Sequence, residues 1–218
     1  MFPTNCTFAE ILLPMDDKLT LILQTTGGLF RKYGIRSISM DDIAREIGMS
    51  KKTLYQYVEN KTDLIEKLLL HLVSSSRACI TEETSNLNAI DVLIQVSIKV
   101  SREIKEMNPS IAFDLEKFYP TLYRNFVNAK RDHVYRKIKE NLEQGVSEGI
   151  YRNDVDSDLV AKLYVQKLMD VHDPEFLSSV DFSFEKVFQV MFDNHIRGIA
   201  NPEGLAYYEK QINKQISL

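Results

Sequence analysis

Three lysines lie where the sequence predicts that α-helices begin. Ser50 is a favourable N-cap residue, so Lys51 and Lys52 fall in the first turn of the helix that follows it. Lys61 directly follows Asn60, which is another favourable N-cap. A helix N-terminus carries a partial positive charge, so a cation there is unfavourable by ~0.3–1 kcal/mol unless an anion accompanies it. Helix N-termini and lysines together form a phosphate site, and we expect a DNA backbone to supply the missing anion.

The residues around these lysines have the pattern of a helix–turn–helix. Ser39 is followed three residues later by Asp42, and the two together predict a capped helix start. Gly48 permits the left-handed backbone conformation that ends such a helix. Leu54 and Val58 are four residues apart, which places them on the buried side of the next helix. A helix–turn–helix inserts its second helix into the major groove, so the lysines predict DNA binding.

The composition limits the classes of protein to which this chain can belong. It has 218 residues, of which 44% are hydrophobic, and this suffices for a substantial core. The net charge is −4, but residues 31–61 carry seven Lys and Arg against four Asp and Glu, a net of +3. A basic segment on an acidic chain fits a confined contact with nucleic acid.

No residues have the spacing of a catalytic or metal site. Cys6 and Cys79 are far apart, which predicts reduced thiols, and His133, His172 and His195 are isolated. The sequence contains no Gly-rich phosphate loop, nucleophile elbow or zinc motif. It also lacks a membrane-spanning run of ~18–20 apolar residues and the basic start of a signal peptide. We therefore expect a cytoplasmic protein that is not an enzyme and that binds no cofactor, metal or membrane.

Apolar residues at helical spacing predict an all-α fold with about nine helices. We expect an irregular arm over residues 1–15, a three-helix DNA-binding domain over 16–62, and a larger helical ligand-binding and dimerisation domain over 63–218. Outside the helix–turn–helix, helices are expected near residues 16–33, 60–80, 89–107, 109–118, 121–148, 158–171, 184–198 and 204–216. The helix that begins at residue 60 should link the two domains.

Two of the expected helices are apolar over more than one face. These are the helices near 158–171 and 184–198, and the second carries Phe184, Phe188 and Phe192. Two such helices from each of two chains can form an intermolecular four-helix bundle, which predicts a homodimer through these helices. The alternative is that the helix near 184–198 is simply buried in the centre of a single chain.

The N-terminal region resembles the TetR family of transcriptional regulators. The residues that carry the resemblance are ILQTTGGLFRKYG at 22–34 and SMDDIAREIGMSKKTLYQYVENKTDL at 39–64. The stretch GIYRNDVDSD at 149–158 is similar to the turn that precedes the dimerisation helices of that family. The rest of the chain matches the family only in its architecture. The chain departs from the family pattern at Thr25, Thr26, Gly27–Gly28 and Val58, none of which is on the expected DNA-binding face.

The resemblance assigns a set of helix–turn–helix residues to DNA binding. They are Ser39, Ser50, Lys51, Lys52, Thr53, Tyr55, Gln56, Tyr57 and Lys61. The residues expected near base edges are Lys51, Lys52, Thr53 and Gln56, because lysine can read guanine, glutamine adenine, and a threonine methyl the thymine methyl. Tyr55 and Tyr57 would lie against the sugar–phosphate backbone, while Lys61 and the region of Ser39 would clamp phosphates.

Each of these assignments has an alternative in ordinary structure. Tyr55 could be a half-buried core residue, since it lies beside Leu54 in the sequence. Lys51 and Lys52 could be solvated charges on a helix surface, and Gln56 could be plain surface as well.

The resemblance also implies that the larger domain binds a small molecule. An apolar pocket would be lined by aromatic and sulfur-containing side chains. The candidates are Met107, Phe113, Phe118, Tyr119, Tyr123, Phe126, Tyr164, Met169 and Phe176. Any one of them could equally be packed core, and nothing in the sequence identifies the ligand.

Together these observations predict a TetR-like repressor that binds a palindromic DNA operator as a homodimer and is released by a small-molecule ligand. The alternative is a DNA-binding regulator whose C-terminal domain binds a protein partner or acts as an activator, with no small-molecule inducer. A helical scaffold without a DNA role is a further alternative, and salt-dependent binding to a palindromic promoter fragment would distinguish it from a repressor.

Overall fold

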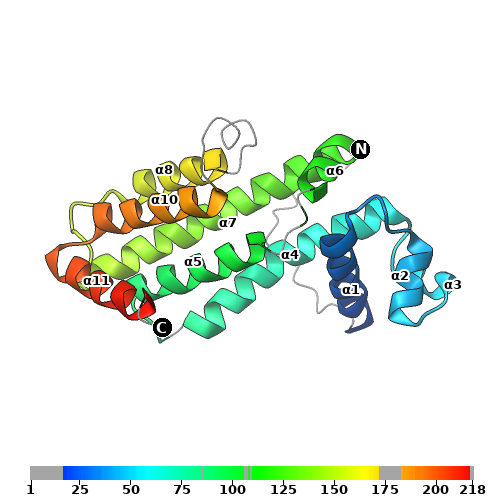
Figure 1. The fold of residues 1–218 in the computed structure, drawn as a ribbon, viewed down its shortest axis with the longest axis horizontal. Coiled ribbons are helices and arrows are strands. Elements are labelled where there is room, and N and C mark those ends of the chain that lie inside the picture. Colours follow the sequence, from blue (N-terminus) through cyan, green and yellow to red (C-terminus); the bar gives the residue numbers. More distant parts are fainter. Residues whose placement is uncertain (1–16, 85, 106–107, 109, 172–182, 217–218) are drawn as a thin grey trace, which may run out of the picture. The chain divides into compact units, whose positions relative to one another are not determined.

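The computed structural model describes residues 17–84, 86–105, 108, 110–171 and 183–216, and these are almost entirely helical (Figure 1). Ten α-helices occur in this part of the chain, which confirms the predicted all-α fold. They are α1 (Asp17–Tyr33), α2 (Met40–Ile47), α3 (Lys51–Leu54), α4 (Lys61–Thr84), α5 (Ala89–Lys105), α6 (Ser110–Phe118), α7 (Pro120–Ser147), α8 (Ser157–Val171), α10 (Phe184–Ile199) and α11 (Pro202–Ile216). None of the described helices is long and apolar enough to cross a bilayer. The expected arm over 1–15 lies outside the described residues.

The chain divides into two compact units. The first comprises Met1–Leu72 and Met107–Arg124, and the second comprises Val73–Glu106 and Asn125–Leu218. The first unit therefore contains α6, although this helix lies far beyond α3 in the sequence. Helix α4 begins in the first unit and continues into the second. The expected division into a DNA-binding domain over 16–62 and a ligand-binding and dimerisation domain over 63–218 stays a prediction.

The core of the first unit is built on α1 and the start of α4. Ile22 and Leu23 of α1 are fully buried, as are Leu54 of α3 and Leu64 of α4. Val58 is also buried, as expected, but it lies in the connection after α3 and not on the second helix of the motif. Helix α3 packs against α2, and α2 packs against α1.

The adjacent glycines of α1 do not arise from close packing. A Cβ atom at Gly28 would meet nothing within 4 Å, and one at Gly27 would approach Leu68 Cδ1 at an ordinary 3.4 Å. Thr26, beside them, is fully buried, and its hydroxyl has no hydrogen-bond partner among the described residues. Glycine inside a helix costs about 1 kcal/mol relative to alanine, so this stretch lowers the stability of α1.

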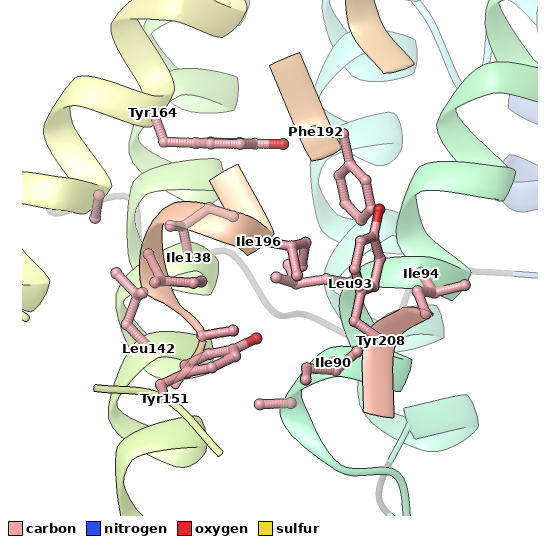
Figure 2. Close-up of a cluster of buried hydrophobic side chains, with 14 of the residues drawn as sticks. Ile90, Leu93, Ile94, Ile138, Leu142, Tyr151, Tyr164, Phe192, Ile196 and Tyr208 are labelled. Carbon is pink, nitrogen blue, oxygen red and sulfur yellow. The ribbon is translucent and has the colours of Figure 1, made fainter. Parts of the chain in front are cut away.

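The core of the second unit joins α5, α7, α8, α10 and α11. Figure 2 shows Ile196 of α10 between Ile138 and Leu142 of α7 on one side and Leu93 of α5 on the other. Ile196 and Leu142 are completely buried, and Tyr208 of α11 is 2% exposed. Helix α10 is therefore the central element of this core.

The turn at 149–151 is held closely against the segment that follows α10. The Arg152 N–H donates to the Ile199 carbonyl at 2.9 Å, and Tyr151 forms an isolated β-bridge with Ala200. The ring of Tyr151 leaves no room at Gly145, where a Cβ atom would lie 2.1 Å from Tyr151 Cδ2. The stretch that resembles the family turn is thus a tightly packed connection.

The structure corrects part of the argument for a dimer. On α10, Phe188, Phe192 and Ile196 are all buried in the core of the single chain, as the alternative interpretation expected. Phe184 also begins this helix. Among the side chains that the structure describes on the two helices, the large apolar residues that remain exposed are Leu159 and Leu163 of α8 and Val190 of α10. The excess of apolar surface is thus smaller than the sequence indicates, and it lies mainly on α8.

Candidate nucleic-acid interface

Helix α2 begins with the predicted capping box. Ser39 Oγ accepts the Asp42 N–H at 3.2 Å, and Asp42 Oδ2 accepts the Ser39 N–H at 2.9 Å. The hydrogen bond from the Ser39 hydroxyl is the main reason that the pKa of Asp42 is lowered. Gly48, with φ of 77°, ends the helix in the left-handed conformation. These local contacts fix the entry to the turn that leads into α3.

Helix α3 is a single turn that presents polar side chains to solvent. Ser50 Oγ accepts the Thr53 N–H at 3.0 Å, which confirms the predicted N-cap. Regular helix ends at Leu54, and the chain continues through a turn over 55–57. Lys51, Lys52 and Gln56 are exposed. Tyr55 is 42% exposed, so it is no core residue and remains available for contact. Thr53 and Tyr57 are partly buried.

Lys51 does not lack an anion. Its Nζ lies 2.9 Å from Asp41 Oδ2, and the hydrogen bond to Asp41 is the largest cause of the raised pKa of Lys51. Asp41 is the second residue of α2, so this ion pair spans the turn between the two helices of the motif. The expectation of an uncompensated cation is therefore wrong for Lys51, because a carboxylate ten residues earlier folds back onto it.

Lys61 is also satisfied within the chain. Its Nζ donates to the carbonyl of Ile35 at 2.6 Å and to that of Ile38 at 2.5 Å. Both carbonyls belong to the turn that follows α1, and partial burial lowers the pKa of Lys61. The two hydrogen bonds use two of its three N–H donors. Of Lys51, Lys52 and Lys61, Lys52 alone forms no ion pair or side-chain hydrogen bond within the described part of the chain.

Lys67 contributes a contact that sequence reasoning missed. Its Nζ donates to the Tyr57 carbonyl at 3.0 Å and pairs with Asp63 at 2.7 Å. It therefore fastens the turn after α3 to α4. The spacing of four residues between Asp63 and Lys67 is a recognisable signal for the ion pair, but nothing in the sequence indicates the bond to the carbonyl.

Helix α6 packs on the turn after α1. A Cβ atom at Gly34, where φ is +81°, would lie 2.9 Å from Ser110 Oγ. The Arg36 N–H donates to the buried Asp114 at 3.4 Å, and the Arg36 guanidinium lies 4.6 Å from the centre of the Phe118 ring. Sequence reasoning did not foresee this contact, because α6 is separated from α1 by more than seventy residues.

The described residues of the expected pocket differ in their burial. Phe113 and Phe118 of α6 are 58% and 42% exposed, because Asp114 and Leu115 occupy the buried positions of that short helix. Tyr119 and Tyr123 are partly buried, and burial raises the pKa of each. All four belong to the first unit. Their assignment to a ligand pocket stays a prediction.

The remaining pocket candidates are in the second unit or outside the described residues. Phe126 is partly buried, Tyr164 is part of the core of the second unit, and Met169 packs against that core. Met107 and Phe176 lie outside the described residues. Tyr164 contacts His195 of α10, with ring centroids 4.4 Å apart. The pocket as a whole stays a prediction.

Burial lowers the pKa of His195 to about 4, and Lys167 adds to this effect. Its Nε2 is buried and has no hydrogen-bond partner among the described residues. No cluster of His, Cys, Asp and Glu suited to a metal ion occurs in the part of the chain that the structure describes. The imidazole is therefore a partly buried side chain that lies tilted against the Tyr164 ring.

Comparisons with known proteins agree with the geometry of the helix–turn–helix. The family described as "Bacterial regulatory proteins, tetR family" matches residues 22–68. An HTH-type transcriptional regulator of Bacillus subtilis, YvaF, is 24% identical over 84% of this chain and 95% of its own length. The HTH-type transcriptional repressor KstR2 of Mycolicibacterium smegmatis is 25% identical over 64% of this chain and 70% of its own length.

A solved structure shares the fold over most of the chain. It is that of a transcriptional regulator from Saccharomonospora viridis in complex with choline, which has a TM-score of 0.59 and 18% identity. The likeness covers 86% of this chain and all of the other. This likeness shows that the two proteins share an overall helical fold. The match over residues 22–68 and the similar proteins together support a transcriptional regulator of the TetR family.

Proposed function

We propose that this regulator represses transcription by binding a palindromic DNA operator as a homodimer, and that a small-molecule ligand releases it. The observation that carries the proposal is the exposed first turn of α3, which has Lys51 and Lys52 and no acidic residue. Lys52 is solvated and unpaired among the described residues, so a DNA phosphate or base can bind it without breaking a contact. A regulator acts where the chromosome lies, so we place the protein in the cytoplasm.

The exposed side chains of α3 suit the major groove. Lys52 can donate to guanine O6 and N7, and Gln56 can form a paired contact with adenine. Tyr55 has enough exposed surface to lie against the backbone, where such contacts fix the register. The third donor of Lys61 can reach a phosphate, although its main contacts are with the chain itself. Ser39 and Ser50 cap the N-termini of α2 and α3, and amide groups at such termini can donate to a phosphate.

The proposed dimer uses α8 and α10. Leu159 and Leu163 lie one helical turn apart on α8 and are 53% and 54% exposed. Exposed leucines at this spacing form an apolar stripe that a second copy of the helix can cover, and Val190 of α10 adds to the apolar surface. A dimer also places two recognition helices on the two halves of a palindrome, about 34–36 Å apart.

Two of the similar proteins support the finer parts of the proposal. KstR2 is named a repressor, and the regulator from Saccharomonospora viridis was solved with choline. A ligand of this chain would act by binding better to a form of the dimer in which the two recognition helices no longer match one turn of DNA. The nature of that ligand stays open.

The test begins with selection of duplexes from a random pool, followed by anisotropy titrations on the selected sequence. Lys52→Met and Gln56→Ala should each weaken binding and relax the preference at one base position, by about 1–3 kcal/mol for a lost base contact. Lys210→Met removes the same charge from an exposed site on α11 and should leave binding unchanged. Selection that yields no consensus, or a Lys52→Met protein that binds as the wild type does, would contradict the proposal.

Dimerisation is tested separately by sedimentation. Leu163→Glu should give a monomer that binds the selected duplex more weakly than the wild type, because only one half-site contact remains. Ala206→Glu introduces the same charge at an exposed position on α11, outside the proposed interface, and it should leave the dimer intact. A Leu163→Glu protein that sediments as a dimer would place the interface elsewhere.

The exposure of α6 favours a second candidate function. Phe113 and Phe118 are large aromatic side chains at the surface, and such residues are typical anchors of protein–protein contacts. The alternative is therefore a DNA-binding regulator that binds a protein partner or acts as an activator, without an inducer. A transcription assay with purified polymerase distinguishes the two, because a repressor lowers transcript yield from the bound promoter and an activator raises it.

A further inference from the structure

The ion pair between Asp41 and Lys51 lies at the proposed DNA-binding surface. Asp41 is in the first turn of α2, Lys51 opens α3, and their charged atoms are 2.9 Å apart. The two side chains are 55% and 49% exposed, so the pair is in solvent and both partners can be reached by a large anion. A carboxylate thus stands beside the N-terminus of the recognition helix, where DNA would approach.

We infer that Asp41 is a positioning residue that withholds Lys51 from DNA phosphates and so keeps the affinity for non-specific DNA low. The inference rests on the proposed DNA-binding role of α3. A phosphate that approaches Lys51 must displace the carboxylate or tolerate its repulsion. Lys52, the adjacent residue, has no such competitor among the described residues. The two neighbouring lysines therefore contribute unequally, although the sequence presents them as equivalent.

Asp41 is not needed for the local fold in the way that Asp42 is. Asp42 forms both hydrogen bonds of the capping box with Ser39, whereas the contact found for the Asp41 side chain is with Lys51. The Lys51 ammonium holds its proton more tightly because of this hydrogen bond, which agrees with a formed pair. Replacement of Asp41 therefore leaves the cap of α2 in place and frees Lys51.

The expected effect appears in the salt dependence of binding. Each phosphate neutralised by the protein changes the slope of log K against log salt concentration by about −0.9. Asp41→Asn should therefore steepen this slope by about 0.9 for each subunit that contacts a mixed-sequence duplex. At about 0.1 M monovalent salt the same term corresponds to roughly eightfold tighter binding per subunit.

A matched control is available in the second unit. Asp154 pairs with Arg152 at 3.7 Å, and both side chains are exposed, so Asp154→Asn removes the same charge and also frees a cation. It should leave the salt slope unchanged, because this pair is far along the chain from α3. Lys51→Met in the Asp41→Asn background should return the slope to that of Lys51→Met alone. Circular dichroism checks folding, and Asp41→Ser is the second variant if Asp41→Asn is poorly folded.

Three results would overturn the inference. The slope of Asp41→Asn could equal that of the wild type, the control Asp154→Asn could steepen it as much, or the effect of Asp41→Asn could persist in full without Lys51. The last result would mean that Asp41 repels DNA directly and does not act through Lys51. Failure of the wild-type protein to bind any duplex at low salt would instead contradict the proposed DNA-binding role itself.

Discussion

In both compact units, side-chain nitrogens donate hydrogen bonds to main-chain carbonyls near helix ends, but the two units use different side chains for this. In the first unit, Lys61 and Lys67 donate to carbonyls of the turns that follow α1 and α3. In the second unit, neutral amides do this: Asn141 donates to the Ala89 carbonyl at 2.8 Å, and Asn201 donates to that of Gly149 at 2.7 Å. The side chains that donate to these carbonyls in the first unit thus carry positive charge. A count of cations in a helix–turn–helix therefore overestimates the number that are free for DNA.

The largest loss of stability is expected on replacement of the buried amide of the second unit, Asn141. Asn141 is 5% exposed, and besides its bond to Ala89 its Oδ1 accepts the Tyr151 hydroxyl at 3.1 Å. Asn141→Ala leaves the buried Tyr151 hydroxyl without its acceptor and removes the side-chain donor from the Ala89 carbonyl, which should cost about 2–4 kcal/mol. Urea unfolding followed by circular dichroism measures the loss. Asn194→Ala, at an exposed site on α10, should change stability by less than about 0.5 kcal/mol.

Acid should destabilise the second unit through His195. The pKa of this residue is about 4 in the folded protein and 6.5 in its ordinary state, so the unfolded chain binds the proton more readily. Its contribution is complete above pH 6.5 and is lost as the pH falls toward 4, by up to about 3 kcal/mol. Unfolding at a series of pH values checks this. His195→Leu should flatten this part of the profile, and an unchanged profile would show that the neutral form is not required.

A smaller loss of stability is expected on replacement of Lys61 in the first unit. Lys61→Met deprives the carbonyls of Ile35 and Ile38 of their donor, and since the site is partly solvated the cost should be about 1–2 kcal/mol. Lys52→Met, the matched loss of a lysine, should leave stability unchanged and weaken DNA binding. Equal stability of the two variants would mean that the hydrogen bonds of Lys61 do not stabilise the first unit. The difference between the two units described above would then not hold.

The smallest effect should be a gain in the first unit. Gly28→Ala adds a methyl group where nothing lies within 4 Å, and it should stabilise α1 by about 1 kcal/mol. Gly48→Ala has equal space but a φ of 77°, so it should destabilise the protein by about 1–2 kcal/mol. Thermal unfolding of the two variants gives the comparison, and a shift in the same direction for both would show that backbone conformation does not decide the outcome.

The parts of the fold that the sequence predicts correctly are local. Ser39 and Asp42, or Ser50 and Thr53, are three residues apart, so each cap forms within one turn of chain. The helix bounds follow from the same short-range signals and agree with the structure to within a few residues for most helices.

The errors concern contacts between distant segments. The bonds from Lys61 to the carbonyls of Ile35 and Ile38 span more than twenty residues, and no pattern of residue types indicates them. On α6, the sequence could not show that Asp114 is buried and that Phe113 is exposed, because the helix packs on a segment more than seventy residues away. Side chains that depend on such packing have to be seen in the structure.

The close approach of Tyr151 to Gly145 restricts how this protein can vary among its descendants. A methyl group at position 145 has no space while the tyrosine ring is present, so position 145 can become larger only if position 151 becomes smaller. Lineages that acquire a larger residue at 145 should therefore carry a smaller one at 151. Such a change would also remove the Tyr151 hydroxyl, which donates a hydrogen bond to Asn141. A third substitution, at position 141, should therefore accompany the first two.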